Sequence, residues 1–325
     1  MRKMRVAVTG LLGVVAQGAY SQSFEQQVVQ ISHKVSGASL QTWQAMAASQ
    51  AAAVQGCGEG CVPGAINPAD ALDETKVGVA AKFVAIKPSV LEIGSPKDEA
   101  GRGDDEIQHS VQLTQGYEMQ ATAVTQLQYF LVMGRNPATF GKQENCDANN
   151  FKVVYGLGLC VNHPVENVSW DDAQAFIAQL NKTQSKYTYR LPTEAEWENA
   201  ARAGMPSGFP YSFGFNDTNE LNNYAWYDGN SSDRTHAVAT KKANQWGLYD
   251  MNGNVWQWVN DYYGGYPAAA VQDPSGPATG SFRVTRGGSW YFNAGRLRSA
   301  YRGGAGSGLR VCDLGFRLVR SAVTP

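Results

Sequence analysis

The chain has 325 residues, with 27 Lys and Arg against 28 Asp and Glu, so its formal net charge is -1. A chain without excess positive charge is not expected to bind nucleic acid or an anionic membrane across its surface. Only 17% of the residues are charged, whereas 35 are glycine, 8 tryptophan and 15 tyrosine. This mixture argues against a helix bundle and favours a loop-rich globular protein with a sizeable core.

Residues 1–21 resemble a secretory signal peptide. Arg2, Lys3 and Arg5 give the segment a basic start, and a mostly apolar run leads to small residues at the expected cleavage site. The apolar run is too short to span a bilayer, so we expect no stable membrane anchor. The sequence therefore predicts a protein that is exported to the periplasm or secreted.

Residues 22–76 are expected to form a helical extension followed by a linker with two cysteines. The first part is rich in alanine and glutamine with apolar residues at helical spacing, and the second is rich in glycine and proline. Disulfides are allowed in an exported chain. Cys57 and Cys61 suit a small structural clip. Cys146 and Cys160 bracket a polar loop, which leaves Cys312 as the odd cysteine.

The main domain is expected to cover residues 77–325. Alternating or apolar runs predict strands at 82–86, 111–117, 282–286 and 314–320. Three helices are predicted from their first residues. Thr125 and Thr193 begin capping boxes, and Ser169 precedes two aspartates and a run with helical spacing.

The stretch 246–258 is dense in aromatic and short polar side chains. It reads Trp-Gly-Leu-Tyr-Asp-Met-Asn-Gly-Asn-Val-Trp-Gln-Trp, so rings that favour burial alternate with oxygens that need partners when buried. Two arrangements satisfy both needs. The loop either wraps around a hard cation such as calcium or is held by side-chain to backbone hydrogen bonds. The spacing is not that of an EF-hand.

No familiar catalytic or metal-binding motif occurs in the sequence. The four histidines lie far apart, and there is no phosphate-binding loop or nucleophile elbow. The C-terminal region is rich in arginine instead. We interpret Arg286 and Arg317 as residues that lock loops through carbonyls and carboxylates. An anion-binding role is left open for Arg296, Arg298 and Arg302.

Several multi-residue motifs follow one another between residues 80 and 321. They are PVENVSW at 164–170, RLPTEAEWE at 190–198, the stretch 247–258, RGGSW at 286–290 and GFR at 315–317. In this order they resemble the formylglycine-generating enzyme (sulfatase-modifying factor) family. The resemblance implies an α+β fold with a C-type-lectin-like core, little regular secondary structure and bound calcium.

By position, the resemblance implies calcium ligands at Asp250, Gly253, Val255 and Gln257, in part through backbone carbonyls. Gln257 stands where the family usually has a glutamate, so one negative charge is missing and the ion should be held more weakly.

Family members that oxidise a substrate cysteine to formylglycine hold copper between two cysteines shortly after the Gly-Gly-Ser. Soft thiolates are needed there because the metal is Cu(I). The corresponding positions here are Phe292 and Leu297, and neither side chain binds copper. Cys312 is a single thiol elsewhere and cannot replace a pair. The resemblance implies the fold, but we expect no copper and no oxidase activity on sulfatases.

The first candidate function is an exported binding or accessory protein. Its C-terminal lectin-like surface would contact a protein, a peptide or a small molecule. The second is a periplasmic tailoring enzyme with altered chemistry that acts on a peptide or small molecule. Its candidate pocket consists of Ser289, Trp290, Phe292, Arg298 and Tyr301. Whether the chain catalyses any reaction is left open by the sequence.

The third candidate resembles the variable proteins of diversity-generating retroelements, which display randomised residues on the same fold. Plausible display positions are Tyr291, Phe292, Gly295, Arg296 and Tyr301. The family's own oxidase activity ranks below these three because the cysteine pair is missing.

Overall fold

The computed structural model describes residues 68–183, 186–214 and 218–323. These residues belong to one compact unit, and the predicted start of the domain at Val77 lies inside the first described range. The predicted signal peptide, most of the predicted extension and the Cys57–Cys61 pair lie outside the described residues. Of the helices that are described, none has both the length and the apolar character needed to cross a membrane.

Short helical segments at the start of this unit pack against the first long helix. They are a 3-10 helix (Pro68–Leu72), α4 (Glu74–Val77) and a second 3-10 helix (Gly78–Ala81). The helix that they contact is α5 (Gln126–Met133). The Gln128 side-chain amide donates to the carbonyls of Ala71 and Ala80, at 2.8 and 3.1 Å. These buried bonds make the segment part of the domain.

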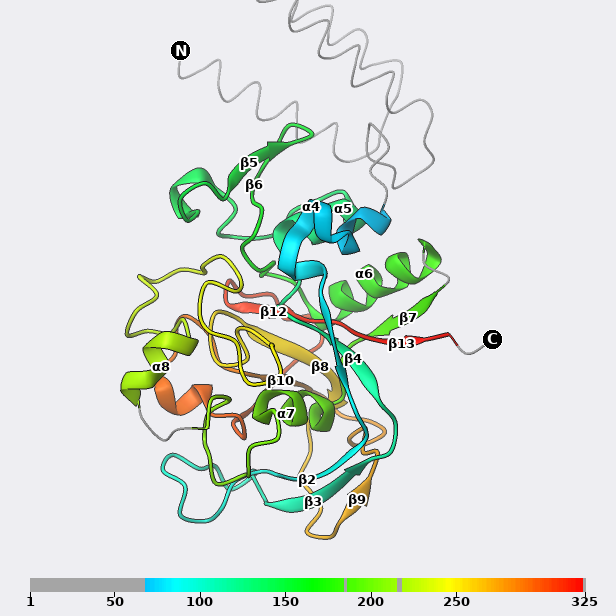
Figure 1. Ribbon diagram of the computed structural model, residues 1–325, viewed down its shortest axis with the longest axis vertical. Coiled ribbons are helices and arrows are strands. Elements are labelled where there is room, and N and C mark those ends of the chain that lie inside the picture. The colour runs from blue at the N-terminus through cyan, green and yellow to red at the C-terminus, as the bar shows by residue number, and fades with distance from the viewer. Residues whose placement is uncertain (1–67, 184–185, 215–217, 324–325) are drawn as a thin grey trace, which may run out of the picture. The chain divides into compact units, whose positions relative to one another are not determined.

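Two four-stranded sheets form the centre of the domain (Figure 1). The first has the order β1 (Phe83–Ile86), β4 (Tyr117–Gln120), β13 (Val319–Ala322) and β7 (Tyr187–Arg190). The second has the order β11 (Arg302–Ala305), β10 (Arg283–Arg286), β8 (Trp256–Tyr262) and β12 (Leu314–Phe316). Neighbours are antiparallel except for β12, which runs parallel to β8. This parallel pair joins the central loop directly to the C-terminal strands.

Two smaller sheets complete the strand set of the described residues. One has the order β2 (Ser89–Ile93), β3 (His109–Leu113) and β9 (Val271–Gln272), and the other is the hairpin of β5 (Phe151–Val154) and β6 (Leu157–Cys160). All strands are short and long loops connect them, which confirms the predicted loop-rich α+β fold.

The three predicted helix starts are confirmed. Thr125 caps α5 and Thr193 caps α7 (Glu194–Arg202), each with a complete capping box. The Ser169 hydroxyl accepts from the Asp172 N–H at 3.0 Å at the start of α6 (Trp170–Thr183). A further helix, α8 (Thr218–Tyr224), lies beside the central loop region (Figure 1). The apolar face of α6 packs into the core.

Two of the predicted strands are wrong in extent, because each predicted stretch contains residues of two separate strands. The stretch 111–117 turns at Gly116, where a Cβ atom would come within 3.1 Å of the Ile86 carbonyl oxygen. The stretch 314–320 divides into β12 and β13, which belong to different sheets. The break lies at Arg317, whose buried guanidinium donates to the carbonyls of Gln120 and Tyr249 at 3.1 and 2.7 Å. A charged side chain that needs several carbonyls bends the chain toward them.

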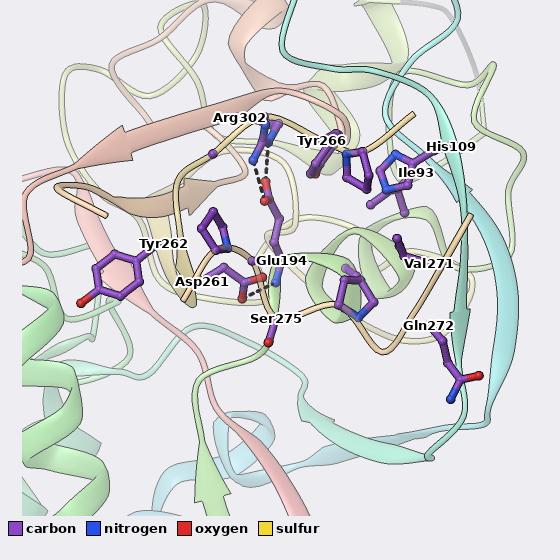
Figure 2. A pocket seen from close by; sticks show the side chains of 17 residues that line it. Ile93, His109, Glu194, Asp261, Tyr262, Tyr266, Val271, Gln272, Ser275 and Arg302 are labelled. Carbon is purple, nitrogen blue, oxygen red and sulfur yellow. Dashed lines mark hydrogen bonds and ion pairs between the residues drawn. The ribbon is translucent and has the colours of Figure 1, made fainter. Parts of the chain in front are cut away.

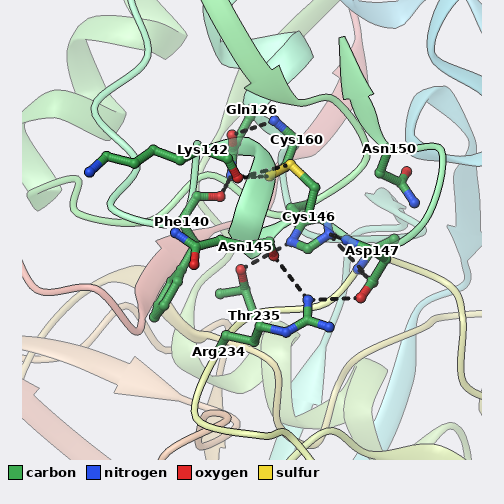
Figure 3. The surroundings of a disulfide bond; sticks show 12 residues. Gln126, Phe140, Lys142, Asn145, Cys146, Asp147, Asn150, Cys160, Arg234 and Thr235 are labelled. Atoms are coloured by element: carbon green, nitrogen blue, oxygen red, sulfur yellow. Dashed lines mark hydrogen bonds and ion pairs between the residues drawn. A yellow bond between two sulfur atoms is a disulfide. The ribbon is translucent and has the colours of Figure 1, made fainter.

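Cys146 and Cys160 form a disulfide that joins the segment before β5 to the last residue of β6 and so encloses the β5–β6 hairpin (Figure 3). The adjacent Asp147 carboxylate accepts hydrogen bonds from Arg234 at 2.9 Å and from the Ala237 N–H at 2.8 Å. It also contacts the His236 ring at 3.0 Å. This carboxylate therefore ties the disulfide loop to the segment that leads into the central loop.

Candidate functional site

Side-chain to backbone hydrogen bonds hold the central loop, 246–258, ahead of and within β8. The Asn252 side chain accepts from the Ser212 N–H at 3.1 Å and donates to the Leu297 carbonyl at 2.6 Å. The Asn254 side chain pairs with both the N–H and the C=O of His236, at 3.1 and 3.0 Å. These bonds belong to the second of the two arrangements that the sequence allowed.

Asp250 and Gln257 differ as ligands for a cation. One oxygen of the buried Asp250 carboxyl accepts from the Ala239 N–H at 2.9 Å, and the other is buried without a donor among the described residues. Burial raises the pKa of this carboxyl. The Gln257 side-chain oxygen, in contrast, already accepts from Trp197 Nε1 at 2.8 Å and from Arg317 Nε at 2.6 Å. An amide oxygen with two donors has no lone pair left for a metal.

The predicted calcium ligands therefore fit only in part. The free oxygen of Asp250 suits a hard cation, whereas Gln257 serves Arg317 and Trp197 instead. The described residues include no group of three or more histidine, cysteine or carboxylate side chains that could hold a metal. Calcium at this loop stays a proposal that rests on Asp250 and the carbonyls of Gly253 and Val255.

Arg298, one of the candidate pocket residues, is buried against two carboxylates. Its guanidinium contacts Glu99 at 2.6 Å and both oxygens of Glu106 at 2.7 and 2.6 Å. Burial raises the pKa of Glu106, but hydrogen bonds from Arg298 and Ser95 outweigh burial and hold that pKa below its usual value. Arg298 thus anchors the segment 289–301 from below, and its charge is not offered to solvent.

Arg302 and Arg286 also form internal ion pairs, so their charges are not available to a ligand. Arg302 binds Glu194 in a bidentate pair at 2.7 and 2.8 Å. Arg286 contacts Glu198 and donates to the Tyr301 carbonyl at 2.5 Å. Together with the carbonyl contacts of Arg317, these contacts have the geometry expected of loop-locking arginines. Of the three arginines left open by the sequence, only Arg296 is exposed.

A run of aromatic rings forms the outer face of the segment 289–301. We call its exposed and half-buried side chains the C-terminal aromatic surface; it consists of Tyr291, Phe292, Arg296 and Tyr301. The buried rings of Trp256 and Trp290 lie beneath it. Ring centroids of Trp256 and Phe292 are 5.7 Å apart, and those of Tyr291 and Phe292 are 5.5 Å apart. The Arg296 guanidinium lies 4.9 Å from the centre of the Tyr301 ring. Tyr291 is 62% exposed, so the surface offers flat rings and one cation to a ligand.

Two carboxyl groups lie near Trp290 at the edge of this surface. The Ser289 hydroxyl donates to Asp313 at 2.7 Å, and Trp290 Nε1 donates to the Cys312 carbonyl at 3.2 Å. Burial, with a smaller contribution from the Asp313 charge, raises the pKa of Glu166 to about 8. Burial and the same two carboxylates raise the pKa of the Cys312 thiol. The only free cysteine of the described residues is therefore a weak nucleophile at neutral pH.

The five predicted pocket residues thus lie on one segment but not in one cavity. Phe292 and Tyr301 are half-buried and reach the surface, whereas Ser289, Trp290 and Arg298 are buried beneath it. Glu99, Glu106, Glu166 and Asp313 were not singled out from the sequence as site residues. Asp313 stood out in the sequence only as the lone acid of an arginine-rich region. Glu106 and Glu166 belong to motifs that carry the family resemblance, but nothing in the sequence indicated what they contact.

The order of motifs and the loop-rich fold agree with a comparison of the sequence with models of known protein families. The model of the sulfatase-modifying factor enzyme 1-like domain matches residues 68–322. The chain belongs to this family. Within the sulfatase-modifying factor family, a formylglycine-generating enzyme of Streptomyces coelicolor is 37% identical over 180 residues, which cover 50% of this chain and 54% of that enzyme. The chain therefore matches about half of that relative's length.

For two other similar proteins, the match to this chain spans a larger share of their length. A chaperone protein, LppX of Paenibacillus barcinonensis, is 30% identical over 233 residues, which cover 61% of this chain and 78% of the chaperone. The solved structure of variable protein 1 of Treponema denticola superposes with a TM-score of 0.63 at 33% identity, covering 73% of this chain and 94% of that protein. Proteins similar to this chain thus include an enzyme, a chaperone protein and a variable protein.

Proposed function

We propose that this family member is an exported binding or accessory protein that offers its C-terminal aromatic surface to a protein or peptide ligand. The observation that carries the proposal is the chemistry at Phe292 and Leu297, the positions that the resemblance assigns to copper-binding cysteines. Leu297 is fully buried among apolar residues, and Phe292 packs on Trp256. Hydrocarbon side chains cannot bind Cu(I), and Cys312 is a single thiol.

The composition of the surface supports a binding role. Aromatic residues and arginine supply most of the binding energy at protein interfaces, because they bury large flat areas at low entropic cost. Here Tyr291 and Arg296 are exposed, while the buried contacts of Arg298 hold the segment in place. The similarity to a chaperone protein also favours an accessory role, and residues 1–21 favour export.

Oxidase activity is tested with purified protein, Cu(I) and a peptide that carries a sulfatase cysteine motif. We expect neither tight copper binding nor aldehyde formation. The double variant Phe292→Cys, Leu297→Cys is the matched comparison, since it restores a thiolate pair and is expected to bind Cu(I). Aldehyde formation by the unaltered chain would refute the proposal.

Ligand binding is tested by selecting peptides from a random library on the full chain. We expect selected peptides to lose at least about tenfold in affinity when Tyr291 and Tyr301 are changed to serine, as for residues at an interface centre. Val90→Ser is the control, because Val90 is 68% exposed on β2, outside this surface. Peptides whose binding survives the tyrosine changes would place the binding surface elsewhere.

The variable display protein was the third candidate from the sequence, and the similarity to the Treponema denticola variable protein favours it. The exposed positions Tyr291, Gly295 and Arg296 would then differ between copies of the gene. A reverse transcriptase and a near-copy of the 3′ coding region beside the gene are the expected findings. Their absence would remove this candidate and leave the binding proposal intact.

A further inference from the structure

A pocket lies away from the C-terminal aromatic surface, where β8 ends and α7 begins (Figure 2). Its volume is about 290 Å³, which suits a ligand the size of one side chain. None of its lining residues belongs to the C-terminal aromatic surface. Its walls are apolar and are formed by Ile93, Pro267, Val271, Pro274 and Pro277.

The Asp261 carboxyl lines this pocket and is only 3% exposed. One of its oxygens accepts from the Glu194 N–H, the first of α7, at 3.0 Å. No other hydrogen bond reaches this carboxyl within the described part of the chain. A buried carboxyl is normally paired with a cation or fully hydrogen-bonded, and Asp261 has neither arrangement.

The other acids near Asp261 have their own arginines. Glu194 is paired with Arg302, and Glu196 forms a bidentate pair with Arg190 at 2.6 and 2.7 Å. Burial and the charges of Glu194 and Glu196 together raise the pKa of Asp261 to about 8, against smaller opposing effects of the Glu194 N–H hydrogen bond and of Arg302. The pocket thus contains one carboxyl more than its arginines neutralise.

Two more polar groups of the pocket are suited to accept or share a proton. His109 Nδ1 lies 2.9 Å from the Ile107 carbonyl, so Nδ1 carries the proton and Nε2 of the neutral ring is an acceptor. The Tyr266 hydroxyl is buried beside the Glu194 carboxylate, and the centres of the Tyr266 and His109 rings are 4.8 Å apart. The free polar atoms are therefore mainly acceptors, and the Arg302 donors already face Glu194.

We propose that this pocket binds a small organic cation, an ammonium group on a short alkyl chain, with Asp261 as its ionic partner. The N–H groups of such a ligand would reach the carboxylate and the acceptors beside it, and the alkyl chain would lie against the prolines, Ile93 and Val271. A free alkylamine and the side chain of an exposed lysine on another protein share this chemistry. An anion or a neutral hydrocarbon would leave Asp261 unpaired.

Binding is coupled to loss of the Asp261 proton, because only the ionised carboxylate pairs with an ammonium group. The affinity for butylammonium should therefore rise about tenfold per pH unit from pH 6 toward pH 8 and then level off. Between pH 6 and pH 9 this amounts to about a 100-fold increase, which calorimetric or NMR titration of the full chain can measure. Butylammonium keeps its own charge over this range.

Three comparisons test the assignment. Asp261→Asn keeps an acceptor for the Glu194 N–H but cannot ionise, so we expect at least about a tenfold loss of affinity at pH 9 and no pH dependence. Glu92→Gln removes one exposed carboxylate from β2 and should leave binding unchanged. Butanol, a neutral analogue, should bind much more weakly than butylammonium.

The outcomes separate clearly. The proposal is overturned if butylammonium does not bind the unaltered chain at pH 9, if its affinity is the same at pH 6 and pH 9, or if Asp261→Asn binds as well as the unaltered chain. The pH series needs no variant, so it decides the matter even if Asp261→Asn fails to fold. Binding of N-acetyl-lysine amide as well as butylammonium would point to a protein side chain, and binding of butylammonium alone to a free amine.

Discussion

Replacing Arg298 by methionine is expected to lower the free energy of unfolding by about 3–5 kcal/mol, as for other broken buried ion pairs. Arg298 makes five hydrogen bonds, three of them to Glu99 and Glu106 and two to the carbonyls of Gly295 and Gly101. Methionine preserves most of the apolar stem, so the loss comes from leaving two buried carboxylates without a cation.

Urea unfolding followed by tryptophan fluorescence at pH 7 measures this loss. The matched control is Arg296→Met, which removes the same charge from an exposed side chain two residues away, and we expect it to change stability by less than about 0.5 kcal/mol. Adding Glu106→Gln to Arg298→Met should recover part of the loss, because one uncompensated charge disappears.

The dependence of stability on pH in the acid range gives an independent check of the same reasoning. In the unaltered chain Glu106 has a lowered pKa, so its contribution is present above its unfolded pKa and is lost as the pH falls through the folded value. The deficit of Arg298→Met should therefore shrink toward about pH 4, where the orphaned carboxyls take up protons. A loss below about 1 kcal/mol at pH 7, or one equal to that of Arg296→Met, would refute the argument.

Three further predictions concern other parts of the domain. Changing Cys146 and Cys160 together to serine should lower the free energy of unfolding by about 3 kcal/mol, given a loop of 14 residues; an unchanged urea midpoint would contradict this. Because burial raises the pKa of Glu166 to about 8, its folded carboxyl keeps a proton that the unfolded one loses, and stability falls from about pH 5 to pH 8. Glu166→Gln should remove this fall, on the order of 4 kcal/mol, in urea titrations across that range. Excess calcium chelator should lower the Tm if calcium is bound at Asp250, and Asp250→Asn should abolish the response; an unaltered melting curve would remove calcium from this loop.

Local features of the fold could be predicted from the sequence because their causes are local. The capping boxes at Thr125 and Thr193 need only four residues, and α5 and α7 begin where they predict. The Cys146–Cys160 disulfide joins two cysteines that are only 14 residues apart in the chain. The family could be predicted because whole motifs occur in order, without any knowledge of their contacts.

Long-range charge pairing could not be predicted in the same way. Arg298 and Glu99 are 199 residues apart in the chain, and no spacing rule connects them. Arg317 was placed inside one strand, since nothing in the apolar pattern shows that its guanidinium needs carbonyls from β4 and from the distant central loop. Asp261 was overlooked for a related reason. Its neighbours in the sequence are strand residues, and the acids that raise its pKa come from α7.

The buried ion pairs beneath the segment 289–301 have a consequence for how this protein can change over generations. Arg286, Arg298 and Arg302 fasten the segment to acids that solvent does not reach, so its course is set from the inside. The outward side chains, such as those of Tyr291 and Arg296, contribute little to fixing the course of the backbone. New side chains can be tried there one after another while the scaffold keeps its shape, and a surface of this kind can acquire a different ligand without first becoming unstable.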